Sequence, residues 1–313
     1  MTSEQKQPLV SVIIPNYNHA QYLEQRLDSV FGQTYPNYEV IFLDDCSKDN
    51  SLEVVNRYKD NPHLSQIVVN ETNSGSVFKQ WDKGINLAKG ELIWIAESDD
   101  YCELNLLEEF IIEWNKYDNV AMAFCNYVQF DEETGYKQIP YEKKNRCFDG
   151  LEFIRKRMAR TNAPVNASGC VFSKKAFEKM PHDFLEFRSA GDYMFWTSIM
   201  TQGNVIRIRK NLTYYRIHCG SVTNNCVSKG ITSLEDIKVF RFIEKQVHLS
   251  KYDRYMAKIA HYEKYVPVKF DTEEIRKNVL TQWGLYGVKK NKPLSNLLLW
   301  LPIRFENYFG ILI

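Results

Sequence analysis

The first 130 residues alternate short apolar segments with amphipathic ones, and this alternation constrains the fold more than any other feature of the chain. The apolar segments are four to eight residues long and rich in β-branched and aromatic residues, as in buried strands. They are residues 9–14, 38–43, 66–69, 91–96 and 121–128. The segments between them have helical spacing. We therefore predict an α/β fold with a mostly parallel sheet and helices on both faces.

A polar cluster follows each of the first four predicted strands. The clusters are PNYN (15–18), DDCSKD (44–49), NETNSG (70–75) and ESDD (97–100). The carboxyl ends of parallel strands meet at one edge of a sheet, and ligands of such sheets bind beyond that edge. We therefore expect the four clusters to converge on one ligand site.

The pattern changes after residue 130. Residues 131–220 mix short helices with strands, two of which are predicted at 205–208 and 212–217. Residues 221–313 are predicted to be mainly helical. The expected organisation is a domain of residues 1–220, in which 1–130 bind the ligand, followed by a helical region at 221–313.

The composition excludes several classes of protein. Seven cysteines without a C-x-x-C pair argue against a disulfide framework or a structural zinc site and fit the reducing cytoplasm. A formal net charge of +1 gives no sign of nucleic acid as a partner. The first eight residues have no apolar signal core, and no run of 18 apolar residues is present. We therefore expect a cytoplasmic protein.

The segment 294–313 is the most apolar stretch near the end of the sequence, and it follows several lysines. A basic flank beside Trp, Phe and Leu suits a helix that lies in a membrane interface, at the inner face of the cell membrane. A helix that packs on the protein's own core or in a dimer contact explains the pattern equally well. Both alternatives stay open.

Two acidic clusters are the strongest candidates for chemistry. The adjacent carboxylates of ESDD repel one another unless a cation is present, and hard oxygen ligands suit Mg²⁺ or Mn²⁺. Asp44 and Asp45 are placed to accept hydrogen bonds from a ribose hydroxyl or a base N–H. The simpler alternative for both clusters is capping of the helix that follows, by Asp49 or Asn50 in the second case.

Several common motifs are absent. The sequence contains no G-x-G-x-x-G and no G-x-x-x-x-G-K-[ST], which argues against dinucleotide oxidoreductases and P-loop NTPases. It also contains no G-x-S-x-G and no H-E-x-x-H.

Taken together, the motifs that are present resemble family 2 glycosyltransferases with the GT-A fold. The matching text is VSVIIPNYNHAQYLEQRLDSVFGQTYPNYEVIFLDDCSKDNS, then NSG, then GINLAKGELIWIAESDD. The resemblance is strong over residues 9–130 and looser at 190–196 and 215–223. It implies inverting transfer of a sugar from a nucleotide-diphosphate sugar, in the first place a UDP-sugar, to a hydroxyl of a polysaccharide or lipid-linked acceptor. Mn²⁺ or Mg²⁺ is the implied cofactor.

The resemblance also implies roles for nucleotide-binding residues within 1–130. Tyr17 stacks on the base, and Asp45 binds it. Asp44 holds the loop of Asp45. The other implied contacts to the nucleotide or its diphosphate are Pro15, Asn18, Asn73, Lys79, Glu97 and Ser98.

The remaining implied roles concern metal, sugar and proton transfer. Asp99 is the principal metal ligand, His218 contacts diphosphate or metal, and Asp100 contacts donor sugar or metal. Asp192, in the acceptor region at 131–220, is the general base. The simpler alternatives are a helix N-cap for Asp192 and a strand-end histidine satisfied by the backbone for His218.

Two departures from the family pattern stand out. Glu97 occupies the first position of the D-x-D motif, and Gly191 precedes Asp192 where a glutamate is common. Glu186 is a lower-ranked candidate for the base. These departures keep a non-catalytic, nucleotide-sugar-binding partner subunit as an alternative. A nucleotidyltransferase is a further alternative, although PNYNHAQY lacks the Gly-rich basic loop that would hold a triphosphate.

Overall fold

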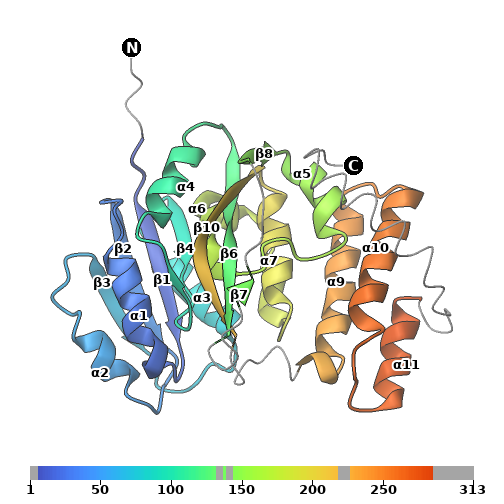
Figure 1. The fold of residues 1–313 in the computed structure, drawn as a ribbon, viewed down its shortest axis with the longest axis horizontal. Helices are drawn as coiled ribbons and strands as arrows, with labels where there is room; N and C mark the ends of the chain where they lie inside the picture. Colours follow the sequence, from blue (N-terminus) through green and yellow to red (C-terminus); the bar gives the residue numbers. More distant parts are fainter. Residues whose placement is uncertain (1–5, 132–136, 139–143, 218–225, 285–313) are drawn as a thin grey trace. The chain divides into compact units, whose positions relative to one another are not determined.

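The computed structural model describes residues 6–131, 137–138, 144–217 and 226–284, and these form two compact units (Figure 1). The first, called the sheet unit, comprises 1–148, 164–181 and 202–219. The second, called the helical unit, comprises 149–163, 182–201 and 220–313. The chain therefore leaves and re-enters each unit, while the boundary expected at residue 220 stays a prediction.

One sheet organises the sheet unit. Its strands run in the order β3-β2-β1-β4-β9-β6-β10-β5, with β7 on β6 and β8 on β10. The strands are β1 (Val10–Asn16), β2 (Tyr38–Asp44), β3 (Leu64–Val69), β4 (Leu92–Ile95), β5 (Tyr101–Cys102), β6 (Val120–Asp131), β7 (Lys137–Gln138), β8 (Arg146–Phe148), β9 (Cys170–Ser173) and β10 (Asn204–Ile217). The predicted α/β class is confirmed.

The direction of pairing changes along this sheet. Neighbours in the β3-β2-β1-β4 half are parallel, as expected from the alternating segments. Strand β9 then lies between β4 and β6 and is antiparallel to both, while β6 and β10 are parallel. The sheet is thus mixed, because a strand from beyond residue 169 inserts into it.

The prediction of two strands at 205–208 and 212–217 was wrong. One strand, β10, covers both segments and pairs with β6 through register shifts between Ile208 and Thr213. Such bulges leave residues unpaired without ending the strand. The break in the apolar sequence pattern between the two predicted strands therefore marks a bulge and not the end of a strand.

Helices on the sheet unit bury apolar stripes against the strands. They are α1 (Ala20–Phe31), α2 (Ser51–Asn56), α3 (Val77–Leu87), α4 (Leu106–Trp114) and α6 (Lys174–Lys179). In α1 the buried positions include Leu23, Leu27 and Val30, at helical spacing. Helix α3 approaches the sheet closely at Gly84, where a Cβ atom would lie 2.4 Å from Ile13 Cγ2. This close packing fixes the loop before α3 near the ends of β1 and β2.

The helical unit has its own core. It contains α5 (Gly150–Phe153), a π-helical turn (Ile154–Met158), α7 (Gly191–Met200), α9 (Ile231–Gln246), α10 (Lys251–Tyr265) and α11 (Glu273–Gln282). The buried cluster of α9, α10 and α11 is Ile237, Tyr265, Val279, Leu280 and Trp283. The predicted helical C-terminal region is confirmed. Over the residues that the structure describes, no helix has the length and apolar character to cross a bilayer; the segment 294–313 lies outside them.

Candidate active site

The loops after β1 and β2 are joined through Asp44. Its carboxylate accepts hydrogen bonds from Asn16 Nδ2 at 3.0 Å and from the Ser47 backbone N–H at 2.8 Å. Asn18, in the left-handed region with φ 55°, accepts from the Lys48 N–H at 2.7 Å. Pro15 is buried in β1, whereas Tyr17 is 45% exposed beside these loops. Asp44 therefore braces the edge, and Tyr17 is available to a ligand.

The carboxylate of Asp45 accepts hydrogen bonds from the loop that follows β3 and from α3. Its Oδ1 accepts from Asn70 Nδ2 at 2.6 Å, the Ser74 N–H at 2.8 Å and Gln80 Nε2 at 3.0 Å. Its Oδ2 accepts from the Ser74 hydroxyl at 2.7 Å. These bonds tie β2, the 70–76 loop and α3 into one structure, so Asp45 has a structural role whatever it binds.

Asn73 and Lys79 lie in the same region. Asn73 Nδ2 donates to the Asp45 carbonyl at 3.0 Å, and Asn73 Oδ1 accepts from the Gly75 N–H. Gly75 has φ 71°, which favours glycine. The ammonium of Lys79 donates to the Ser74 carbonyl at 3.3 Å and is exposed. The predicted convergence of these loops with those after β1 and β2 is therefore present.

The ESDD turn follows β4 and contacts α3 and the residue before α1. Glu97 Oε1 accepts from Trp81 Nε1 on α3 at 2.8 Å, and the Ser98 hydroxyl bonds His19 Nδ1 at 2.8 Å. Asp100, nearly fully buried, accepts from the Ser168 hydroxyl at 2.7 Å and from the Arg216 N–H at 3.0 Å. The N-cap of α4 is Asn105. The turn therefore does not cap the following helix, and the capping alternative was wrong.

Two buried arginines hold this turn, and neither was predicted from the sequence. Arg26 of α1 donates from Nε to the Glu97 carbonyl at 2.8 Å, and its Nη2 lies 4.0 Å from Asp100 Oδ2. Arg216 of β10 donates to the Asp99 carbonyl at 2.7 Å and lies over the Tyr22 ring. A charged residue on the apolar face of a helix was the available signal for Arg26.

The acidic turn is electrostatically crowded. Burial, and then the charge of Asp99, raise the pKa of Glu97 to about 8 and that of Asp100 to about 7. Carboxylates that repel one another in this way supply the hard oxygen ligands that a divalent cation prefers. Among the described residues no group of three or more His, Cys, Asp or Glu forms a metal site, and His218 lies outside those residues. The metal roles stay predictions.

Asp192 lies in the helical unit, in the first turn of α7. Its Oδ2 accepts from Asn162 Nδ2 at 2.8 Å and its Oδ1 from the Tyr193 N–H at 2.8 Å. The N-cap position belongs to Ala190, so the alternative of Asp192 as N-cap was wrong. Glu186, the lower-ranked candidate, is exposed at the end of a 3₁₀ turn (Asp183–Glu186).

The start of α7 is held by a residue that the sequence did not reveal. The buried carboxylate of Glu235, on α9, accepts from the backbone N–H groups of Arg188, Ser189 and Ala190 at 2.8, 2.9 and 2.8 Å. The Ala190 N–H belongs to the N-cap of α7 and has no partner within the helix, and the other two donors precede the helix. Glu235 therefore fixes the segment leading into α7 from another helix, while Asp192 Oδ1 accepts the Tyr193 N–H in the first turn of α7.

The surroundings of Asp192 raise its proton affinity. Burial, and then the charge of Asp236, raise the pKa of Asp192 to about 6, against the Tyr193 N–H, Lys264 and Asn162, which lower it. Asp236 is itself buried and accepts from Lys264 Nζ at 2.6 Å. A carboxylate with this pKa is ionised near neutral pH and accepts a proton more readily than an exposed aspartate.

Comparison with known proteins agrees with this arrangement. The Glycosyl transferase family 2 model matches residues 11–180. The chain is 36% identical over 224 residues to the putative teichuronic acid biosynthesis glycosyltransferase TuaG of Bacillus subtilis, covering 70% of this chain and 82% of TuaG. It is 27% identical to the glycosyltransferase GlyG of Streptococcus pneumoniae, covering 68% and 72%. With the poly(ribitol-phosphate) beta-N-acetylglucosaminyltransferase TarS of Staphylococcus aureus it shares 26% identity over 66% of this chain and 35% of TarS.

Solved structures show the same fold. Residues 1–349 of S. aureus TarS, in complex with UDP-GlcNAc, superpose with a TM-score of 0.68 at 20% identity, covering 88% of this chain and 80% of that one. The mannosyltransferase PcManGT of Pyrobaculum calidifontis, in complex with GDP-Man and Mn²⁺, gives a TM-score of 0.58 at 17% identity, covering 97% and 82%. The expected GT-A fold is confirmed.

Proposed function

Because the chain belongs to glycosyl transferase family 2, we propose that it moves a sugar from a nucleotide-diphosphate sugar to a hydroxyl of a saccharide or lipid-linked acceptor. The observation that supports this best is the meeting of the loops after β1, β2 and β4 at one edge of the sheet unit. There Asn16 bonds Asp44, and Trp81 of α3 bonds Glu97. The polar groups at that edge offer hydrogen-bond acceptors to a nucleoside and oxygen ligands to a cation.

The nucleotide moiety of the donor is assigned to the first three loops. The exposed ring of Tyr17 offers a stacking surface for the base, and Pro15 and Asn18 shape that end of the pocket. Asp45 Oδ2, which accepts one hydrogen bond from the protein, has capacity for a base N–H. Asn73 lies on the loop before α3 and Lys79 in the first turn of α3, and we assign both to the diphosphate. UDP is the first choice of nucleotide, because TarS is known in complex with UDP-GlcNAc.

The diphosphate and donor sugar are assigned to the ESDD turn. Asp99 would hold Mn²⁺ or Mg²⁺, and a cation there would favour the ionised forms of Asp100 and Glu97 beside it. PcManGT, a fold neighbour, is known with Mn²⁺. When bound, the cation neutralises charge on the leaving diphosphate. Ser98 and Arg26 fix the turn through His19 and the Glu97 carbonyl.

We assign the role of general base, which accepts the proton of the acceptor hydroxyl, to Asp192. As the acceptor oxygen bonds to the anomeric carbon, the bond from that carbon to the diphosphate oxygen breaks, and the hydroxyl proton moves to the Asp192 carboxylate. One such displacement inverts the configuration at the anomeric carbon. Asn162 and the Tyr193 N–H orient the carboxylate for this role.

The names of two relatives support a proposal for the acceptor class. TuaG is named for teichuronic acid biosynthesis, and TarS for transfer of N-acetylglucosamine to poly(ribitol-phosphate). We assign the chain to cell-surface polysaccharide biosynthesis in the cytoplasm, at the inner face of the membrane, with residues 131–220 as the acceptor region. We also propose that residues 294–313 contact the bilayer. Deletion of this segment should move the protein from the membrane fraction to the soluble fraction, and unchanged partitioning would contradict the proposal.

The experiment is a panel of UDP-, GDP- and dTDP-sugars, measured for binding and hydrolysis with Mn²⁺, with Mg²⁺ and with EDTA. We expect one donor class to bind and turn over in a metal-dependent way. Absence of binding to every donor with either cation would overturn the proposal. Turnover that EDTA leaves unchanged would overturn the metal role alone.

A further inference from the structure

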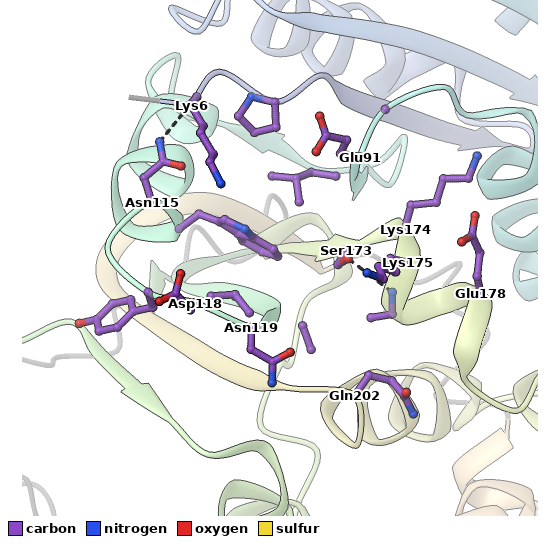
Figure 2. Close-up of a pocket in the computed structure, with 18 of the residues that line it drawn as sticks. Lys6, Glu91, Asn115, Asp118, Asn119, Ser173, Lys174, Lys175, Glu178 and Gln202 are labelled. Carbon is purple, nitrogen blue, oxygen red and sulfur yellow. Dashed lines mark hydrogen bonds between the residues drawn. The ribbon is translucent and has the colours of Figure 1, made fainter. Parts of the chain in front are cut away.

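The sheet unit has a hollow at the edge opposite the nucleotide loops, and Figure 2 shows residues that line it. Its lining comes from the segments before β1, β4 and β6 and from the end of β9, whereas the nucleotide loops follow β1, β2 and β4. Since β1 and β4 are parallel, the two sites lie at opposite ends of the same strands. A strand of this length separates them by roughly 20 Å.

Lysine dominates the charge of this hollow. Six lysines line it: Lys6, Lys89, Lys116, Lys174, Lys175 and Lys179. Three acidic residues do so: Glu91, Asp118 and Glu178. Lys174 donates to the Ala88 carbonyl at 2.6 Å, and Lys116 pairs with Glu113 at 2.6 Å. Among the residues that the structure describes, the other four lysine side chains have no hydrogen-bond or ion-pair partner. The lining therefore contains more cations than anions.

The hollow also contains apolar surface. Trp114, at the end of α4, is half-buried in the lining, and Ile112 and Tyr117 are 37% and 38% exposed. Figure 2 shows Lys6 and Asn115 on one side of the space and Lys174, Lys175 and Glu178 on the other. A lining that contains both aromatic side chains and cations suits a ligand that carries both apolar faces and negative groups.

We propose that this hollow, here called the lysine pocket, binds a saccharide chain that carries carboxylate or phosphate groups. The volume of about 1290 Å³ exceeds that of a typical small-molecule site and fits a short polymer segment. Its concave form suits a thin chain better than the flat surface of a bilayer. The inference rests on the proposed function. A polymer acceptor bound in the lysine pocket would have a higher effective concentration at the sheet edge that carries the nucleotide loops.

The test compares two charge-reversal variants. Lys175→Glu/Lys179→Glu alters one face of α6, since residues four apart lie on the same side of a helix. Lys59→Glu/Lys258→Glu changes the net charge equally at exposed lysines outside the pocket. Binding of oligogalacturonate and of poly(ribitol phosphate) is measured by calorimetry, with dextran, poly-glutamate and phosphatidylglycerol vesicles as comparison probes. The two anionic glycans distinguish carboxylate from phosphate as the group recognised.

We expect at least one anionic glycan to bind, at least tenfold more weakly to Lys175→Glu/Lys179→Glu and within twofold of the parent to the control pair. Equal weakening in both pairs, no weakening in either, or equally tight binding of dextran or poly-glutamate would overturn the inference. Binding to vesicles in place of both glycans would overturn it in favour of a membrane surface. Donor binding is measured in parallel: its failure in the parent protein would count against the proposed function, whereas its retention with lost glycan binding isolates the lysine pocket.

Discussion

The acidic turn of the sheet unit and Asp192 of the helical unit both contain carboxyl groups with raised pKa, but they reach that state differently. In the turn, burial is reinforced by Asp99, a neighbour in the same four-residue sequence. At Asp192, burial is reinforced by Asp236, which lies on another helix. Charge crowding within one turn suits a cation, whereas a single carboxylate fixed by distant residues suits proton transfer. Substitutions in the two regions should therefore have different effects.

The largest effect is expected at the acidic turn. Asp99→Asn should lower metal-dependent turnover by about 10³-fold, because a bound cation contributes several kcal/mol to stabilisation of the leaving group. Turnover against Mn²⁺ concentration measures this. Asp60→Asn, at an exposed site after α2, is the matched control and should leave turnover unchanged. Equal activity of the two variants would remove Asp99 from the metal site.

Loss of Arg26, which holds the acidic turn, should lower the stability of the protein strongly. Arg26→Met removes the partner of the buried Asp100 carboxylate and the donor to the Glu97 carbonyl. We expect the free energy of unfolding to fall by about 3–5 kcal/mol, as when one partner of a buried charged pair is removed. Urea denaturation measures it. Arg57→Met, whose exposed partner Glu24 lies 3.6 Å away, should cost about 1 kcal/mol or less. A similar loss in both variants would contradict the bracing role.

The positioning of Asp192 by Glu235 should have a smaller effect on the reaction. Glu235→Gln weakens the acceptor of three backbone N–H groups, so we expect kcat to fall about tenfold, equivalent to about 1.4 kcal/mol. The dissociation constant of the donor should stay within twofold. Glu274→Gln, exposed on α11, is the control. If Glu235→Gln changed donor affinity and left kcat intact, the positioning role would be wrong.

The smallest effect is a pH dependence. A base with a raised pKa works in its ionised form, so activity should be full above the pKa and decline as pH falls through about 6. Because Asp236 raises this pKa, Asp236→Asn should move the decline to lower pH. The profile of kcat between about pH 4.5 and about pH 8 measures both. If the decline in kcat stayed at the same pH in the variant, Asp236 would have no influence on the group that accepts the proton.

The two regions also differ in how far the sequence predicted them. Asp44, Asp45 and the ESDD turn each follow an apolar strand directly, so their convergence at one edge follows from parallel pairing. The places of β9 and of the bulged β10 in the strand order of the sheet were not predicted, because pairing partners far along the chain decided them.

The surroundings of Asp192 were invisible to sequence reasoning. Asp192 itself was named only through the family resemblance, since a lone aspartate before an apolar helix is typical of a cap. Glu235 and Asn162 lie 43 and 30 residues away along the chain, and no local pattern links them to it. The structure supplied these contacts, which hold the segment before α7 and orient the Asp192 carboxylate.

The most direct test of the account is Asp192→Asn, measured for donor binding and for turnover on the same preparation. Asn keeps the shape and its acceptor oxygen for the Tyr193 N–H, but it does not accept a proton at neutral pH. The account predicts a loss of about 10²–10⁴ in kcat with a donor dissociation constant within twofold of the parent. Turnover within about threefold of the parent would contradict it, since general-base catalysis by Asp192 would then be excluded.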